Sequence, residues 1–325
     1  MSLAALVDTL RSSRGFAHKR DIAGAVQRLT AGLPQAVALG DDCAAIPLGD
    51  AEGGGYLLFA IEGFVEDFVA QMPWFAGYCG VMVNVSDIAA MGGRPVAVVD
   101  ALWSRSAEAA DPVLQGLAAA AERYRVPVVG GHTNQRAASG QLAVAIVGRA
   151  KKLLTSFDAR PGDTLLMAID LRGGFMEPNP FWNASTTAPA ERLRADLELL
   201  PALAEDGLCV AAKDISMAGA VGTALMLLEC SGVGACIDVH TIPRPAGVAI
   251  ERWLQAFPSF GFVLSVRPDR VADVRARFSA RGIAAAAVGS VSAGSQLWLQ
   301  SGEEQHLLWD HAQDTFIGSQ RQGRA

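Results

Sequence analysis

The chain lacks the features that mark several large classes of protein. No apolar stretch in its 325 residues reaches the roughly 18 residues needed to cross a membrane. The segment from Met1 to Arg20 lacks the signal-peptide order of basic, apolar and small residues. We therefore expect a cytoplasmic protein with no membrane partner. The net charge of −6, without a long basic run, argues against nucleic acid as a partner.

Cysteines are few, and their pattern excludes two further classes. The five cysteines form an odd set without paired spacing, so we expect reduced, mostly buried thiols rather than a disulfide framework or a zinc site. The nucleotide motifs GxxxxGK[ST] and GxGxxG are absent, and so is GxSxG. Any nucleotide site in this chain must therefore be of another kind.

What the chain does contain is typical of a globular protein. Hydrophobic residues make up 51% and charged residues 18%, and the length favours two domains. The turn signal at 160–163 suggests a boundary between residues 150 and 162, which gives domains at 1–155 and 156–325. We expect a mobile surface loop at Leu171–Thr187 and frayed residues from Gly318 to Ala325.

Hydrophobic periodicity alternates between helical and extended patterns, which favours an α/β or α+β class. Helices are predicted at 3–10, 22–29, 75–91, 107–124, 190–203, 217–229 and 268–280. Strands are predicted at 56–61, 96–103, 126–129, 142–147, 164–169, 235–239, 261–266 and 285–291.

Acidic residues recur beside glycines or other small residues in five places. The motifs are Gly40-Asp41-Asp42-Cys43-Ala44-Ala45, Ala60-Ile61-Glu62-Gly63, Asn84-Val85-Ser86-Asp87 running on to Gly92-Gly93, Gly130-Gly131-His132-Thr133 and Lys213-Asp214-Ile215-Ser216. Magnesium prefers carboxylate oxygens and often shares them with nucleotide phosphates. Glycines let backbone N–H groups approach phosphate. The set therefore predicts a site for Mg²⁺ and polyphosphate.

The first two motifs each allow a structural alternative. Asp41 and Asp42 either hold a cation or face solvent in a turn, because two adjacent carboxylates cannot both be buried unpaired. Glu62 ends a predicted strand, where it is either a ligand for a metal or an ordinary capping acid.

The next two motifs are equally open. Asn84 and Asp87 are three residues apart, which places them on one helical face beside an apolar stripe; the alternative is a solvated face. Gly130 and Gly131 end a predicted strand in a tight turn. There, His132 would bind phosphate or act as an acid or base, unless it is structural.

The last motif precedes a predicted helix. Helix N-termini attract anions, so Lys213–Ser216 suits a phosphate site. Asp214 or Ser216 would equally serve as the cap of that helix.

Taken together, these motifs resemble the superfamily of aminoimidazole ribonucleotide (AIR) synthetase, with its relatives thiamine-monophosphate kinase, selenophosphate synthetase and hydrogenase-maturation carbamoyl dehydratase. The resemblance runs from about Gly40 to Gly289, and Asn84–Pro95 is its most specific match. It implies a two-domain α/β fold in which the N-terminal sheets of two subunits pair into a barrel, giving a homodimer.

The resemblance also implies the ligands. ATP would bind with Mg²⁺ in this family. The carried-over metal residues are Asp41, Asp42, Asp87 and Asp214, with Glu62 where relatives usually have Asp. The nucleotide would contact Asn84, Gly130, Gly131 and Thr133, and His132 would be the catalytic candidate.

Departures from the family motifs concern the substrate. Thiamine-monophosphate kinases continue Asp-Ile-Ser with Asp-Gly-Leu, whereas this chain has Met217-Ala218-Gly219. Selenophosphate synthetases require a reactive cysteine near the N-terminus, but no cysteine precedes Cys43 here. The C-terminal cysteine of the carbamoyl dehydratase is also missing. A late acidic motif is replaced by Pro258-Ser259-Phe260-Gly261.

Two functions follow from the resemblance. The first is an ATP-dependent phosphotransferase or ligase that acts with the γ-phosphate on a small-molecule acceptor. The second is a nucleotide-binding or regulatory paralogue that has lost catalysis, which the missing acids favour.

Overall fold

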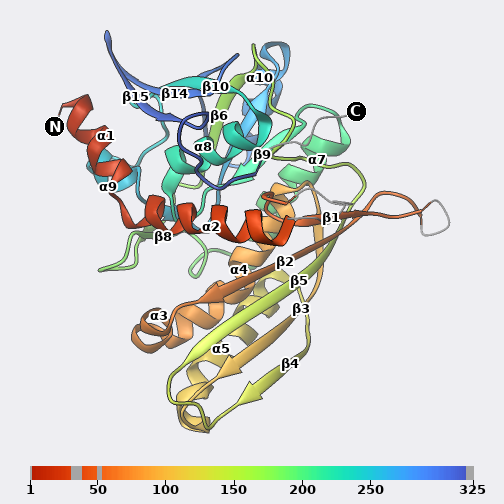
Figure 1. Ribbon diagram of the computed structural model, residues 1–325. Coiled ribbons are helices and arrows are strands. Elements are labelled where there is room, and N and C mark those ends of the chain that lie inside the picture. Colours follow the sequence, from red (N-terminus) through yellow and green to blue (C-terminus); the bar gives the residue numbers. More distant parts are fainter. Residues whose placement is uncertain (1, 31–38, 50–52, 320–325) are drawn as a thin grey trace. The chain divides into compact units, whose positions relative to one another are not determined.

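The computed structural model describes residues 2–30, 39–49 and 53–319 (Figure 1). The chain divides into two compact units. Unit 1 is drawn from Met1–Asp42, Leu154–Thr187 and Leu203–Ala325, and unit 2 from Cys43–Leu153 and Ala188–Ala202.

This division differs from the expected domains 1–155 and 156–325 at the N-terminus and at Ala188–Ala202, which belongs to unit 2. Helices α1 (Leu3–Arg11) and α2 (Arg14–Thr30) belong to unit 1. Arg11 donates to the carbonyl oxygens of Leu307 and Leu308, and Phe16 on α2 packs against Phe316. A single cut along the sequence cannot represent an N-terminal segment that packs on the C-terminal half.

Unit 2 is built on one five-stranded sheet with the order β1-β2-β5-β3-β4. Only β3 and β4 pair in parallel; the other neighbours are antiparallel. The strands are β1 (Ala44–Pro47), β2 (Tyr56–Phe64), β3 (Arg94–Trp103), β4 (Val128–Asn134) and β5 (Gln141–Ala150). The helices are α3 (Glu66–Gln71), α4 (Pro73–Ala90), α5 (Ala107–Tyr124) and α6 (Ala190–Leu197).

Helices α4 and α5 lie on one face of this sheet (Figure 1). Helix α4 starts with Pro73 at its first turn and is buried from Phe75 to Ala90, as expected for a helix that is apolar on all sides. Helix α5 is amphipathic, and the hydroxyl of Ser106 accepts the N–H of Ala109 as its N-cap. The prediction of a helix at 107–124 is confirmed at both ends.

The other face of the sheet carries exposed apolar side chains. Leu58, on β2, points to the helices and is buried, whereas its neighbour Phe59 is 49% exposed and Ile61 is 63% exposed. Both Ile61 and Val99 pair with Ala145 of β5, so they lie on the same open face. Among the described strands of unit 2, β1 and β4 form the two edges of the sheet, and they do not pair with each other.

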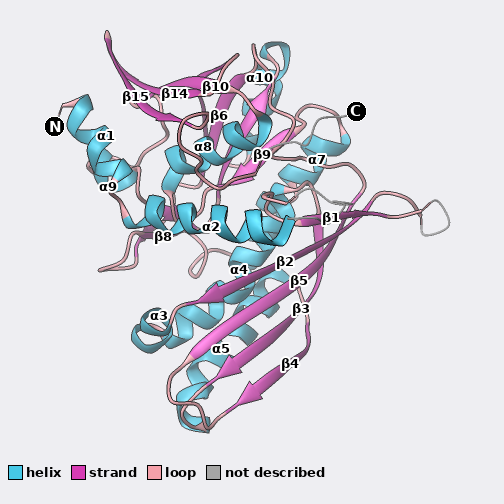
Figure 2. Ribbon diagram, viewed as in Figure 1, coloured by secondary structure: helices cyan, strands magenta, loops and turns pink. Residues whose placement is uncertain are grey.

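Unit 1 contains a seven-stranded sheet with the order β15-β14-β10-β13-β6-β12-β9 (Figure 2). Its strands are β6 (Thr164–Ile169), β9 (Ala211–Asp214), β10 (Gly234–Asp238), β12 (Gly261–Val266), β13 (Ala284–Ser292), β14 (Gln296–Ser301) and β15 (Glu304–Asp310). The predicted strands at 164–169 and 261–266 are confirmed. The remaining helices are α7 (Leu199–Glu205), α8 (Gly219–Ser231), α9 (Ile250–Trp253), the short 3₁₀ helix η2 (Pro268–Arg270) and α10 (Val271–Ala280).

Helix α8 is the centre of this unit. It is buried from Gly219 to Cys230 and packs against β9, β10, β12 and α2. The core cluster around it draws in apolar side chains from both ends of the chain, Leu6 and Phe316 among them.

The segment Leu171–Thr187 is not the mobile surface loop expected from its composition. It carries β7 (Gly174–Phe175) and β8 (Phe181–Asn183), which form a small sheet with β11 (Phe257–Pro258). Trp182 is 6% exposed, and its indole N–H donates to the carbonyl oxygen of Asp170 at 3.0 Å. Buried aromatic contacts therefore outweigh the loop-forming composition.

Two other expectations concern the termini and the thiols. Ser319 is buried rather than frayed, and residues 320–325 lie outside the described residues. All five cysteines are free thiols, and four of them are buried.

None of the helices in the described ranges has both the length and the apolar character required to cross a bilayer.

Candidate functional site

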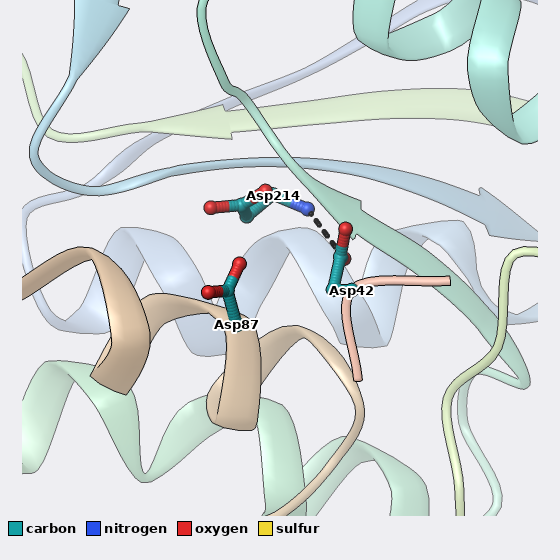
Figure 3. A group of neighbouring side chains, drawn as sticks. All are labelled: Asp42, Asp87 and Asp214. Carbon is teal, nitrogen blue, oxygen red and sulfur yellow. Dashed lines mark hydrogen bonds between the residues drawn. The ribbon is translucent and has the colours of Figure 1, made fainter. Parts of the chain in front are cut away.

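The carboxylate of Asp42 is held at both of its oxygens within unit 1. Its Oδ1 accepts the Lys213 ammonium at 2.6 Å. Its Oδ2 accepts the backbone N–H of Asp214 at 3.1 Å, the contact drawn as a dashed line in Figure 3. The structure thus brings together the first and last of the five predicted motifs.

The geometry of strand β9 sends the side chains of Lys213 and Asp214 in different directions. Successive side chains of a strand point to opposite faces, so these two neighbours diverge. Asp214 is the last residue of β9 and is 4% exposed. Lys213, equally buried, reaches back to the loop around Asp42.

The ammonium of Lys213 binds several groups of the loop around Asp42. Besides Asp42 it donates to the carbonyl oxygen of Gly40 at 3.5 Å and to Ser156 Oγ at 3.4 Å. Burial opposes the charge on this lysine, but Asp42 and Asp41 outweigh it and raise the lysine's pKa above its usual range. Lys213 is therefore a permanently charged cation inside an acidic site.

Asp41 is held chiefly by Ser156. Its Oδ2 accepts the backbone N–H of Ser156 at 2.9 Å and its Oδ1 accepts the Ser156 hydroxyl at 2.6 Å. The N–H of Asp42 adds a third donor at 3.0 Å. Burial raises the pKa of Asp41 to about 6, against the opposing effect of Lys213. These contacts favour Asp41 as a residue that shapes the loop.

In unit 2, Asn84 and Asp87 both lie on α4 and are buried, 0% and 6% exposed, so the solvated-face alternative is wrong. The Asn84 amide nitrogen donates to the carbonyl oxygens of Gly80 at 2.8 Å and Val144 at 2.9 Å, joining α4 to β5. Its Oδ1 has no hydrogen-bond partner among the described residues. A buried acceptor without a partner suits a ligand or a bound water.

The Gly130–Thr133 motif is inside strand β4, and the prediction of a turn there is wrong. Gly131 pairs with Asp100 of β3, and a Cβ at Gly131 would collide with that aspartate's side chain and carbonyl oxygen. This close approach, rather than a turn, explains the need for Gly131. Partial burial raises the pKa of Asp100.

His132 and Thr133 lie at an open depression of about 490 Å³ that is lined by residues 132–136. The His132 ring lies 6.2 Å from that of Trp103 on β3, measured between centroids. The whole of β4 is exposed, so both side chains are accessible within unit 2.

Glu62 lies within β2, which continues to Phe64, so the prediction that it ends the strand is wrong. Its side chain is exposed, and its backbone pairs with Val144 of β5.

Sequence reasoning missed three residues of this region. They are Lys213, whose contact with Asp42 no motif indicates, Ser156 and Asp100. The sequence signal for Asp100 is an acid within an apolar strand, and the signal for Lys213 is a lysine that directly follows the apolar run Val210–Ala212. Nothing local marks Ser156, because its partner lies 115 residues away.

Comparison with known proteins places the chain. It matches the AIR synthase related protein N-terminal domain over residues 40–150 and the C-terminal domain of the same family over 170–300. The chain belongs to the AIR synthase related family, and the resemblance drawn from the motifs is confirmed. The fold is the mixed α/β, two-domain fold of that family.

Three relatives illustrate the range. An uncharacterized protein of Synechocystis sp. is 48% identical over 97% of this chain and 98% of its own length. The thiamine-monophosphate kinase of Pyrococcus abyssi is 34% identical over 41% of this chain and 43% of the kinase. The structure of T. maritima PurL complexed with ATP matches with a TM-score of 0.73 at 18% identity, over 94% of this chain. That likeness shows the fold, and the chain spans about half, 51%, of the PurL chain.

Proposed function

We propose that the protein is a Mg²⁺-dependent ATP-binding enzyme that uses the γ-phosphate of ATP on a small-molecule acceptor. The observation that carries this proposal is the buried arrangement of Asp42 and Asp214, in which Lys213 and a backbone N–H fix the Asp42 carboxylate. Family membership supports it, because the P. abyssi relative is a thiamine-monophosphate kinase and T. maritima PurL was solved with ATP.

The donor set fits magnesium. The metal would take carboxylate oxygens from Asp42 and Asp214 of unit 1, two of the side chains drawn in Figure 3, and Asp87 stays a predicted ligand. These are hard oxygen ligands, and Mg²⁺ typically binds one or two carboxylates plus waters and substrate phosphates. Bound in this way, Mg²⁺ would offset the negative charge of the phosphates. Asp41 would position the loop, and Glu62 remains a predicted ligand.

The nucleotide would be bound by residues of α4 and β4. The unpartnered Oδ1 of Asn84 would accept a hydrogen bond from the ligand or from a water that it holds. The exposed β4 residues Gly130, Gly131 and Thr133 would contact the phosphates. His132 would orient the acceptor or take a proton from it at the edge of the depression.

We further propose a homodimer formed through the open face of the unit 2 sheet. A row of exposed apolar side chains on that face, including Phe59, Ile61 and Val99, supports this. Large apolar patches on a folded unit commonly mark an interface.

Thermal unfolding with ATP, with and without Mg²⁺, tests the binding part of the proposal. Ligand at 100 times its Kd adds about 2.7 kcal/mol to the free energy of unfolding, which raises Tm measurably. A rise in Tm that requires both ATP and Mg²⁺ is the expected result. No rise at millimolar ATP would contradict the proposal.

Turnover separates the enzyme from the lapsed paralogue. Formation of ADP or AMP in the presence of a panel of small hydroxyl- and carboxylate-bearing acceptors is expected of the enzyme. Tight binding without turnover on any acceptor would favour the regulatory alternative, which the missing acid at Met217 supports.

A further inference from the structure

Glu229 is a carboxylate near the C-terminal end of the buried helix α8. It lies on α8 and is 0% exposed. Its Oε1 accepts the backbone N–H of Phe316 at 2.9 Å, and its Oε2 accepts that of Ile317 at 2.7 Å. A carboxyl group at such a depth needs hydrogen-bond partners for its oxygens. Glu229 therefore fastens the C-terminal segment Phe316–Ser319 to α8.

The same segment then reaches the acidic loop. The hydroxyl of Ser319, which is 3% exposed, donates to the carbonyl oxygen of Leu39. Gly40 has a φ of +109°, and a Cβ at that position would overlap Ser319. Gly40, two residues before Asp42, is thus held against the C-terminal segment. No side chain larger than a hydrogen atom fits at this position.

Helix α8 contacts the same loop. Cys230, next to Glu229, places its Sγ 3.7 Å from the carbonyl oxygen of Gly40. Ser231 donates to the carbonyl oxygen of Ser156, the residue that binds the carboxylate of Asp41. Three consecutive residues of α8 thus connect to the C-terminal segment, to Gly40 and to Ser156.

We propose that the C-terminal segment Phe316–Ser319 positions Asp42 for metal binding, with Ser319 and Glu229 as positioning residues that do not touch the metal. The proposal rests on the proposed function, in which Asp42 is a metal ligand. Fixing the backbone of a residue costs conformational entropy, and residues 40–42 belong to no helix or strand. Because contacts from Ser319 already order residues 40–42 in the folded protein, metal binding does not have to supply the free energy that orders them.

Mn²⁺ binding to the full chain tests this with two matched variants. Ser319→Ala removes the hydroxyl that contacts the loop. Ser295→Ala removes a hydroxyl that instead donates to Asp310 Oδ1 at 2.6 Å, elsewhere in unit 1. Outer contacts that orient a metal ligand typically contribute about 10- to 100-fold in affinity. We expect Ser319→Ala to weaken Mn²⁺ binding by about 10-fold or more, and Ser295→Ala to leave it at the wild-type value.

The free energy of unfolding without metal, measured for all three proteins, separates positioning from general stability. Weaker Mn²⁺ binding by Ser319→Ala alone, at a stability close to that of Ser295→Ala, supports the proposal. Wild-type affinity in Ser319→Ala overturns it, as does an equal loss in both variants. A wild-type chain that binds no Mn²⁺ contradicts the proposed metal site itself and leaves Ser319 nothing to position.

Discussion

Lys213 Nζ and Asp42 Oδ1 lie 2.6 Å apart, and each side chain is only 5% exposed. This ion pair is shielded from solvent, unlike exposed pairs such as Arg267–Asp269. Its members cannot rehydrate if one is removed, so each depends on the other. The pair also ties β9 to the loop that carries the predicted metal ligands.

Replacing the lysine should therefore destabilise the protein strongly. Lys213→Met leaves Asp42 and Asp41 buried without their cation, and breaking a buried pair in this way typically costs about 3–5 kcal/mol. Urea unfolding without metal measures the change. The matched control is Arg267→Met, which breaks an exposed pair with Asp269 and should change stability little. Equal, small changes in the free energy of unfolding of both variants would show that Lys213 does not hold the loop around Asp42.

The open sheet face should form the dimer interface. Ile61→Lys places a charge on a side chain that is 63% exposed in the single chain and would be buried on both sides of a two-fold contact. Sedimentation velocity should show a wild-type dimer and an Ile61→Lys monomer. Leu114→Lys, on the helix that covers the opposite face, should remain dimeric. A dimeric Ile61→Lys protein would rule out this face.

Cys209 should make the protein less stable in alkali. Burial raises the pKa of its thiol from 9.0 to about 12. Above pH 9 the unfolded chain loses this proton while the folded chain keeps it, so the stability present below pH 9 falls as the pH rises towards 12. The slope per thiol is about 1.4 kcal/mol per pH unit.

A comparison with Cys209→Ala isolates this effect from the other thiols. Unfolding in urea with reductant, between pH 8.5 and pH 10.5, should show a shallower pH dependence in the variant. The same slope in both proteins would mean that Cys209 ionises in the folded state.

Regular elements with strong hydrophobic patterning were predictable from the sequence. The amphipathic helix 107–124 and the apolar strands 164–169 and 261–266 have the predicted bounds. Their patterns are local, and turn residues mark their ends. The predicted single helix 190–203 instead breaks into α6 and α7 around Glu198, because Pro201 has no backbone N–H to donate to the carbonyl oxygen of Leu197.

The parts that failed depend on contacts between distant residues. The two glycines at 130–131 are typical of a turn, but both lie in β4, where Asp100 of the neighbouring strand leaves no room for a Cβ at Gly131. The candidate carboxylates were found from their motifs. The role of Lys213 could not be predicted, because its partner Asp42 is 171 residues away in the sequence.

We expect the Asp214 carboxylate to help hold Mg²⁺ when ATP binds. Calorimetric titration of a non-hydrolysable ATP analogue into the wild-type protein, Asp214→Asn and Asp206→Asn, each with and without Mg²⁺, tests it most directly. Asp206 is the matched control, because its carboxylate pairs with Arg277 at the surface of unit 1. We predict binding that requires Mg²⁺ in the wild-type protein and in Asp206→Asn and that is lost or greatly weakened in Asp214→Asn. Binding that is independent of Mg²⁺, or unchanged in Asp214→Asn, would contradict the account.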